Sequence, residues 1–247
     1  MRLLELFSGT GSIGSVFESR GWNVTSLDIL PGATITSDIL EWDYKIYPPS
    51  YFDFIWASPP CTHYSMARTT AETPRDFEGA DAIVQRTLDI IEYFRPGGWL
   101  MENPQTGYLK TRAVVQGLPF RDVCYCKHGF PYRKGTRLWG YLPTFEPRQM
   151  CCKRTPCESM EAGRHFATAQ RGSVGERPNR FGVRDLYRIP PLLCEDIAAA
   201  AFSWCLIMGV SSAVGGRNWQ GGMPHGTPGD PDGPLLSRPP QLQALGT

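Results

Sequence analysis

Residues 3–14, LLELFSGTGSIG, join a short apolar run to a glycine-rich turn. The apolar run predicts a buried strand, and the residues after the turn, to about Arg20, are compatible with a helix. The turn fits the pattern G-x-G-x-x-G on Gly9, Gly11 and Gly14. Glycines there permit a tight turn and let a nucleotide approach the backbone at the helix N-terminus. The stretch therefore predicts a nucleotide-like cofactor, with a purely structural glycine-rich turn as the alternative.

The rest of the chain continues this alternation of strands and helices. Further strands are expected in WNVTSLDIL, YFDFIWAS, WLMEN, FRDVCYCKHGF and GTRLWGYLP, and helices in GADAIVQRTLDIIEYFRPGG and IPPLLCEDIAAAAFSWCLIM. Alternation of this kind predicts a parallel sheet with right-handed crossovers. We therefore expect an α/β fold of the doubly wound, Rossmann-like type.

Composition divides the chain into three parts. Residues 1–142 and 180–208 carry the periodic apolar positions and are expected to form one catalytic domain. Residues 143–179 are irregular, basic and cysteine-rich, with too few apolar positions for a core of their own, and are predicted to be an insert. Residues 209–247 contain nine Gly and six Pro, which is typical of a disordered tail.

Charge is unevenly distributed along the chain. The formal net charge is only +1, so composition alone does not indicate a polyanionic partner. Between Lys127 and Arg184, however, there are twelve Lys and Arg against four Asp and Glu, whereas residues 1–126 carry ten basic and fifteen acidic side chains. The second half of the chain is therefore expected to present a basic face.

The N-terminal residues have no small-residue cleavage site and are interpreted as a buried strand rather than a signal peptide. No apolar run approaches the roughly 18 residues needed to span a bilayer. The eight cysteines are expected to remain thiols or metal ligands. These features predict an intracellular protein, cytoplasmic or nuclear, that is not secreted and has no transmembrane segment.

Two aspartates end neighbouring sheet elements. Asp28 follows the second strand, where a carboxylate can accept hydrogen bonds from ribose hydroxyls, which suits NAD and S-adenosylmethionine equally. Asp38 ends a third sheet element and could accept a hydrogen bond from an adenine amino group. A surface turn is the alternative role for Asp38.

The stretch WASPPCTHYSMAR, residues 56–68, ends an apolar run with two prolines and places Cys61 directly behind them. Glu102 ends the strand expected in WLMEN. Ligands of an open α/β sheet bind beyond the carboxyl ends of its strands. A thiol and a carboxylic acid at adjacent strand ends therefore suggest a nucleophile and a proton donor. A buried small cysteine and a loop-capping glutamate are the structural alternatives.

Taken in order, these motifs resemble those of the DNA (cytosine-5) methyltransferases. LELFSGTGSIG resembles the first motif of that family, SPPCTHYS its Pro-Cys motif and MENP its Glu-Asn motif. GFPYRKGTRLWGYLP resembles the Gln-x-Arg-x-Arg segment, with Tyr132 in place of Gln and the basic residues on Arg133 and Arg137. NRFGVRDLYRIPPLLCEDIAAAA resembles the closing motifs, with Tyr187 in place of Asn. The resemblance spans residues 3–205.

The resemblance implies a class I S-adenosylmethionine-dependent methyltransferase fold with a small insert, and methylation of cytosine at C5. The Cys61 thiolate would add to C6 of a flipped cytosine while Glu102 protonates N3. Arg137, with Arg133, would hold O2 of the base or a phosphate. The residues implied to bind the cofactor are Phe7, Gly9, Thr10, Gly11, Ser12, Ile13, Asp28, Ile29, Asp38, Ile39 and Pro59.

Double-stranded DNA is the partner that the resemblance implies, and no obligate protein partner is inferred. The long polar segment after Cys61 is expected to close over the extruded nucleotide, with a plain solvated loop as the alternative. The insert at residues 143–179 corresponds to the variable, target-recognising part of the family. The expected DNA contacts are His63, Ser65, Arg68, Arg75, Arg148, Lys153, Arg154, Arg164 and Arg171.

The insert also carries a possible metal site. Its candidate ligands are Cys151, Cys152, Cys157 and His165, and Cys124, Cys126 and His128 lie just upstream. A structural zinc would explain how a stretch without apolar periodicity stays folded. The spacing fits no standard zinc finger, so ordinary free thiols are the alternative.

Three other functions remain open from the sequence. An amino methyltransferase acting on adenine N6 or cytosine N4 also carries Ser-Pro-Pro, but an aromatic residue follows the prolines there, where this chain has Cys61. C5 methylation of tRNA uses the same catalytic parts. An inactive nucleic-acid binder is the third, against which the set of Cys61, Glu102 and arginines argues. A NAD-dependent oxidoreductase is disfavoured because no hydride-site acid or base is evident beyond Cys61.

Overall fold

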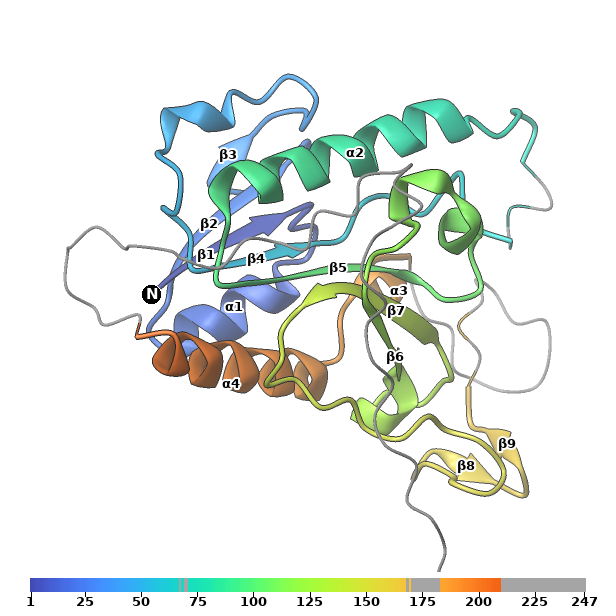
Figure 1. The fold of residues 1–247 in the computed structure, drawn as a ribbon. Coiled ribbons are helices and arrows are strands. Elements are labelled where there is room, and N and C mark those ends of the chain that lie inside the picture. The colour runs from blue at the N-terminus through green and yellow to red at the C-terminus, as the bar shows by residue number, and fades with distance from the viewer. Residues whose placement is uncertain (67, 69–70, 168, 170–182, 210–247) are drawn as a thin grey trace, which may run out of the picture. The chain divides into compact units, whose positions relative to one another are not determined.

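The computed structural model describes residues 1–66, 68, 71–167, 169 and 183–209. Residues Met1–Ala213 form one compact unit, and Figure 1 shows the fold of its described part. The second unit, Val214–Thr247, lies outside the described residues. The expected tail therefore lies outside them as well, except for Gly209.

The described residues build a seven-stranded sheet in the order β3-β2-β1-β4-β5-β7-β6. Its strands β1 to β5 run parallel, and β7 is antiparallel to both β5 and β6. The order reverses direction between β1 and β4, which makes the carboxyl ends of these strands the expected ligand crevice. This topology confirms the doubly wound, Rossmann-like α/β fold. The bounds are β1 (Arg2–Leu6), β2 (Asn23–Asp28), β3 (Ile35–Thr36), β4 (Phe54–Ala57), β5 (Gly98–Pro104), β6 (Phe120–Cys124) and β7 (Gly135–Tyr141).

Helices cover both faces of the sheet, as Figure 1 shows. Helix α2 (Phe77–Phe94) packs on one face, in a core that includes Leu4, Ile55 and Met101. Helices α1 (Ser12–Ser19) and α4 (Pro191–Ile207) pack on the other, with Leu3, Trp56 and Leu100. Neighbouring residues of one strand alternate between these two cores because side chains alternate along a strand.

Helix α2 begins at Phe77, two residues before the stretch in which it was expected, and ends at Phe94, just before Pro96-Gly97. The Asp76 carboxylate accepts a hydrogen bond from the Gly79 N–H at 2.8 Å, which caps the helix N-terminus. The buried positions recur at helical spacing through Ala80, Val84 and Ile91. The helix ends before Pro96, which cannot continue the hydrogen-bond ladder.

Within the described residues, one helical stretch, Asp185–Ile207, is long and apolar enough to cross a membrane by length and composition. Half of its most apolar window is buried inside the protein. The buried side chains of α4, among them Leu193, Ile197 and Ala201, belong to the core shared with α1 and the sheet. This packing is that of a core helix.

Short elements complete the described chain. The strand expected in FRDVCYCKHGF ends at Cys124, and a 3-10 turn, η4, follows it. Within the insert, β8 and β9 form a small antiparallel hairpin, Met160 pairing with His165. The bounds are η1 (Tyr44–Ile46), η2 (Tyr108–Thr111), η3 (Ala113–Val115), η4 (Tyr125–His128), β8 (Met160–Glu161), β9 (Arg164–His165) and α3 (Val183–Tyr187).

Candidate active site

The turn between β1 and α1 has a backbone conformation that requires glycine. Gly9 and Gly11 have φ values of +51° and +65°, in the left-handed region that glycine adopts without strain. Phe7 also lies there, at φ 60°, and such strain in a residue with a side chain is typical of functional sites. A Cβ atom on Gly11 would meet nothing within 4 Å. The space beside the turn is therefore open to a ligand.

A buried carboxylate on β1 supports this turn from below. Glu5 is 3% exposed, and the backbone N–H groups of Ile13 and Gly14 donate hydrogen bonds to it. A Cβ atom on Gly14 would come within 2.5 Å of Glu5 Oε2. Burial raises the pKa of Glu5 from 4.5 to about 7, despite the two backbone hydrogen bonds.

We expect Glu5 to make the stability depend on pH. Above pH 4.5 and up to about pH 7 the folded protein keeps a proton that the unfolded chain has lost. This contribution to the free energy of unfolding is therefore complete below pH 4.5 and is lost as the pH rises through about 7. Its size is of order 3 kcal/mol, at about 1.4 kcal/mol for each pH unit between the two values.

Urea unfolding of a Glu5→Gln variant at pH values from 4.5 to 8 tests this. As the pH rises, the wild type should lose about 3 kcal/mol of unfolding free energy relative to the variant, because a glutamine side chain does not ionise. The exposed Glu18 of α1 supplies a comparison: its charge contributes to raising the pKa of Glu5, after burial, so Glu18→Gln should reproduce only a small part of this change. A difference for Glu5→Gln that stays constant with pH would contradict the expectation.

Asp28, the last residue of β2, connects the glycine turn after β1 to the loop after β2 through hydrogen bonds. Its Oδ2 accepts a hydrogen bond from the Gly9 N–H at 2.8 Å, and its Oδ1 accepts one from the Leu30 N–H at 2.9 Å. Each carboxylate oxygen can accept a further bond. The next residue, Ile29, is 65% exposed, so an apolar surface lies beside this carboxylate.

The other residues expected to bind a cofactor follow the same edge of the sheet. The hydroxyls of Thr10 and Ser12 are 2.7 Å apart, and Ser12 Oγ accepts a hydrogen bond from the Ile189 N–H at 3.3 Å. Asp38 Oδ1 accepts a hydrogen bond from the Leu40 N–H at 2.9 Å, so Asp38 has the turn role that was its alternative. Its contact to adenine stays a prediction. Three of the residues expected to contact the cofactor have buried side chains: Ile13, Ile39 and Pro59.

Cys61 and Glu102 lie at the ends of the neighbouring strands β4 and β5. Asn103 Nδ2 donates a hydrogen bond to the Pro59 carbonyl at 2.9 Å, which holds the Pro-Pro-Cys corner against the end of β5. Cys61 is partly exposed. Burial and the nearby Glu102 charge raise the pKa of the Cys61 thiol, whereas the charge of Lys134 lowers it. The structure therefore brings together the thiol, the carboxylate and a cation.

Two hydroxyl groups hold the buried side chain of Glu102. Its Oε1 accepts hydrogen bonds from Tyr125 Oη, at 3.1 Å, and from Thr136 Oγ1. Burial and the Glu102 charge raise the pKa of Tyr125, so its hydroxyl stays a donor. Among the described residues, Glu102 Oε2 has no hydrogen bond, which leaves that oxygen available to a substrate.

Lys134 is a site residue that the motif comparison missed. Its Nζ lies 4.6 Å from the centre of the Tyr125 ring and donates a hydrogen bond to the Leu186 carbonyl at 3.3 Å. The residue directly precedes β7, which runs antiparallel to β5. The start of an antiparallel strand lies beside the carboxyl end of its neighbour, and this signal could have identified Lys134.

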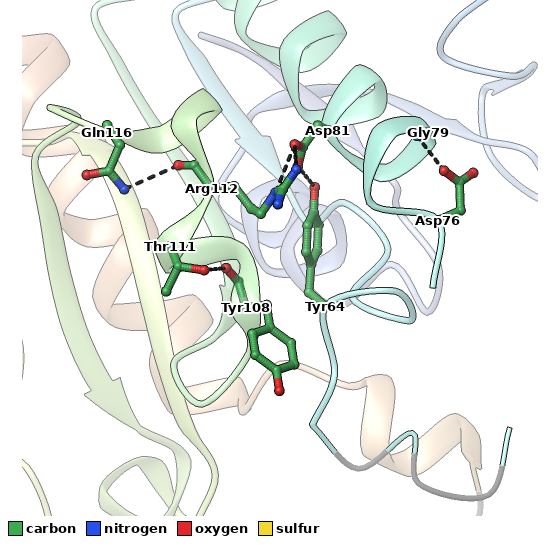
Figure 2. A network of polar contacts seen from close by, with 8 residues as sticks. All are labelled: Tyr64, Asp76, Gly79, Asp81, Tyr108, Thr111, Arg112 and Gln116. Carbon is green, nitrogen blue, oxygen red and sulfur yellow. Dashed lines mark hydrogen bonds and ion pairs between the residues drawn. The ribbon is translucent and has the colours of Figure 1, made fainter. Parts of the chain in front are cut away.

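The turn after Cys61 is anchored by the network in Figure 2. Tyr64 is fully buried, and its hydroxyl donates a hydrogen bond to Asp81 Oδ1 of α2 at 2.7 Å. Arg112 binds the same carboxylate through Nε and Nη2, at 2.9 and 2.8 Å. The Tyr64 N–H donates a hydrogen bond to the Cys61 carbonyl at 3.0 Å. The corner that carries the thiol is thus attached to two elements of the scaffold.

The geometry agrees with a comparison to known proteins. The Frog virus 3 (isolate Goorha) protein named "Probable DNA (cytosine-5)-methyltransferase" is 33% identical to this chain over 216 residues, covering 80% of this chain and 98% of that protein. The chain belongs to the DNA (cytosine-5) methyltransferase family. This confirms the resemblance seen in the motifs. No family model matches the sequence.

Two solved structures of methyltransferases are also similar to the chain. Entamoeba histolytica methyltransferase EhMeth has 18% identity and a TM-score of 0.44, covering 61% of this chain and 56% of that chain. S. pombe Dnmt2 methyltransferase has 18% identity and a TM-score of 0.39, covering 57% of this chain and 50% of that chain. The matches span about half of each structure. Because these scores are low, the fold assignment rests on the strand order of the chain itself.

Arg137, which the basic motif predicted as a base or phosphate contact, does not lie beside Cys61 and Glu102 in the structure. In the pairing of β5 with β7, Arg137 lies opposite Asn103 and Thr136 opposite Pro104. Arg137 therefore projects from the face that α2 covers, where it binds Asp122 through Nε and Nη2 at 2.7 and 2.9 Å. Residues that pair directly across two strands have their side chains on the same face of the sheet, so a shift of one residue moves a side chain to the opposite face. Thr136, rather than Arg137, contacts Glu102.

The side chains of the loop after Cys61 that were predicted to contact DNA form hydrogen bonds within the loop. Arg75 Nη1 donates hydrogen bonds to the carbonyls of His63 and Ser65, at 2.9 and 2.8 Å. His63 Nδ1 accepts one from the Asp76 N–H at 2.9 Å. Arg68 Nη1 donates to the Thr73 carbonyl at 2.8 Å. In this structure these side chains stabilise the loop, and their contact with DNA stays a prediction.

The basic residues of the insert fall into two groups. Arg148 forms a two-pronged ion pair with Asp196 of α4, at 2.8 and 3.1 Å, and so attaches the insert to the domain. Three others are exposed, and their side chains form no hydrogen bond or ion pair within the described part of the chain: Lys153, Arg154 and Arg164. Arg133 is exposed as well. Arg171 lies outside the described residues.

The cluster of possible metal ligands differs from the predicted one in a single cysteine, Cys126 in place of Cys152. Cys152 is exposed, and its Sγ lies 3.1 Å from Thr155 Oγ1, away from the cluster. Its place is taken by Cys126 of η4, which long-range packing brings to the insert. The ligand atoms of the resulting group all lie within 4.8 Å of one another: Cys126, Cys151, Cys157 and His165.

Proposed function

We propose that this protein methylates C5 of cytosine in double-stranded DNA, with S-adenosylmethionine as methyl donor. The observation that carries the proposal is the placement of Cys61 and Glu102 at adjacent strand ends, beside an open glycine turn, in a chain of this family. An amino methyltransferase would use neither a thiol nor a buried carboxylic acid at these positions.

The glycine turn fits the proposed cofactor. Gly9 and Gly11 let a ligand approach the backbone at the N-terminus of α1. Asp28 can accept hydrogen bonds from ribose hydroxyls, and the exposed Ile29 offers an apolar surface to the adenine ring. When bound, S-adenosylmethionine supplies an electrophilic methyl group.

Cys61 makes the ring carbon reactive. Cytosine C5 is a poor nucleophile, but addition of the Cys61 thiolate to C6 pushes the C5–C6 electron pair toward C5 as N3 takes a proton. After C5 has gained the methyl group, it loses its proton to a solvent base. The C6–S bond then breaks, the thiolate leaves, N3 returns its proton to the carboxylate that donated it, and aromaticity returns. The base reaches this thiol only when flipped out of the duplex.

Glu102 serves as the proton donor to N3 in this scheme. Tyr125 and Thr136 both bind Oε1, which fixes the carboxyl group and directs Oε2 to the base. Geometric fixation of this kind is the condition for efficient general acid catalysis.

Lys134 is proposed to favour the thiolate form of Cys61. Its charge lowers the pKa of Cys61, opposing burial and Glu102, and so favours the thiolate. In a Lys134→Met variant we expect the pH profile of kcat/KM, and that of Cys61 alkylation by iodoacetamide, to move to higher pH. Lys45→Met, an exposed substitution on η1, is the control. Unchanged profiles in Lys134→Met would exclude this role.

The exposed basic side chains of the insert are proposed to bind DNA phosphates. Lys153, Arg154 and Arg164 are exposed and without ion-pair partners in the described chain, so each can displace counterions from a duplex. Affinity should then fall with rising salt concentration.

A tritium-transfer assay tests the function. Purified protein with labelled S-adenosylmethionine should label duplex DNA but not tRNA, and the product should read as 5-methylcytosine in bisulfite sequencing. A duplex containing 5-fluorocytosine should form a covalent complex, because fluorine at C5 cannot leave as a proton does. Label in tRNA alone would assign the enzyme to RNA. Label on an exocyclic amino group would overturn C5 chemistry.

A further inference from the structure

We propose that Cys126, Cys151, Cys157 and His165 bind one structural zinc ion that attaches the insert to the catalytic domain. The four ligand atoms lie within 4.8 Å of one another, and Cys151 Sγ is 3.5 Å from His165 Nε2. Tetrahedral zinc with Zn–S near 2.3 Å and Zn–N near 2.0 Å requires S···N separations of about 3.5 Å and S···S separations of about 3.8 Å. The group is therefore nearly at coordination distance.

The surroundings of these thiols explain why a metal is needed. The buried cluster at this place consists of Cys124, Cys126, Cys151 and Cys157, and among the described residues only Met150 and Met160 are partly buried apolar side chains packed against it. So few apolar atoms give little hydrophobic stabilisation to a segment of this length. Metal coordination can supply folding free energy where an apolar core is missing.

The hairpin of the insert directs its histidine into the cluster. β8 and β9 are joined by Ala162 and Gly163, both with positive φ, at 48° and 77°. Two such residues form the tight turn whose twist matches an antiparallel hairpin. The turn sets His165 opposite Met160, with its Nε2 toward Cys151.

A zinc ion bound by three thiolates and a neutral histidine has a net charge of −1. Two nearby groups would stabilise such a site. Lys127 Nζ donates a hydrogen bond to the Pro156 carbonyl at 2.7 Å, directly before Cys157. Cys124 Sγ lies 3.1 Å from Cys126 Sγ and can donate its S–H to that sulfur. Outer contacts of this kind orient metal ligands.

The metal would also act on the active site, a step that rests on the proposed function. Cys126 follows Tyr125 in the turn η4, and Tyr125 donates the hydrogen bond that holds Glu102. Coordination of Cys126 would immobilise this turn. Tyr125 is a positioning residue in this scheme, and the ion has no direct part in the reaction.

Elemental analysis of the full-length protein, purified without chelators, tests the site. We expect one zinc per chain in the wild type and in Cys152→Ser, the matched control, because Cys152 lies outside the cluster. Cys157→Ser and His165→Ala should lose the metal. His165→Cys should retain it, since four cysteines also bind zinc. Cobalt(II) in place of zinc should give the intense visible absorption of a tetrahedral thiolate site.

Three results would overturn the proposal. These are wild-type protein without zinc after exposure to the ion, equal zinc in Cys157→Ser and wild type, and a disulfide within the cluster in protein whose thiols were alkylated at lysis. Metal content is measured independently of methyl transfer. Zinc in a protein that does not methylate DNA would therefore contradict only the proposed function.

Discussion

Replacing Cys61 by Ser is expected to abolish methyl transfer, with a fall in kcat of at least about 10⁴, the scale on which loss of a catalytic nucleophile acts. Serine is nearly isosteric, but its hydroxyl does not ionise near neutral pH, and its oxygen is a weaker nucleophile toward C6. The variant should form no covalent complex with 5-fluorocytosine DNA. Its affinity for duplex DNA and for S-adenosylmethionine should change little, because the side chain is small and partly exposed.

Cys152→Ser is the control for that experiment. Cys152 is also accessible to solvent, so a loss of activity through general thiol chemistry would appear in both variants. Activity in Cys61→Ser within tenfold of the wild type would show that the thiol is not the nucleophile. Such a result would favour amino-group methylation, which needs no covalent intermediate.

Replacing Glu102 by Gln is expected to lower the single-turnover rate of methyl transfer by about 10²–10⁴, the usual contribution of a positioned general acid. The amide oxygen can still accept hydrogen bonds from Tyr125 and Thr136, so the side chain keeps its position. The amide can donate a hydrogen bond to N3 but cannot transfer a proton to it. KM for DNA should therefore change much less than kcat.

Thr136→Val provides a matched comparison for Glu102→Gln. It removes one hydrogen bond to Oε1 and leaves the carboxyl group in place, so a smaller loss of rate is expected. A Glu102→Gln variant that transfers methyl groups within threefold of the wild-type rate would exclude the acid role. Equal losses in both variants would mean that the carboxyl group acts through structure alone.

The parallel half of the sheet and the residues at its edge could be predicted from the sequence. The apolar runs that end in Phe7, Ala57 and Asn103 are short and bounded by Gly or Pro, which makes them recognisable as strands. The carboxyl ends of parallel strands meet at one edge. The glycine turn, Cys61 and Glu102 were therefore brought together in the prediction without any knowledge of packing.

The partners contributed by the antiparallel strand could not be predicted in this way. Comparison of motifs assigned the base contact to Arg137, but in the β5–β7 pairing Arg137 lies opposite Asn103 and Leu138 opposite Glu102. Side chains alternate along a strand, so a shift of one residue changes the face that each side chain occupies. Lys134 and Thr136 thereby reach the active-site face, and Arg137 binds Asp122 on the other.

The cysteines illustrate the same division. Their closeness in the chain grouped Cys152 with Cys151, Cys157 and His165 as candidate metal ligands. The fold selects Cys126 instead, from a turn that follows β6. For this protein, then, local pattern alone predicted the strands along the chain, the glycine turn and the placement of Cys61 and Glu102 at adjacent strand ends. Tertiary structure decided which distant side chains meet them, since such contacts depend on strand register and turn conformation, which residue spacing does not specify.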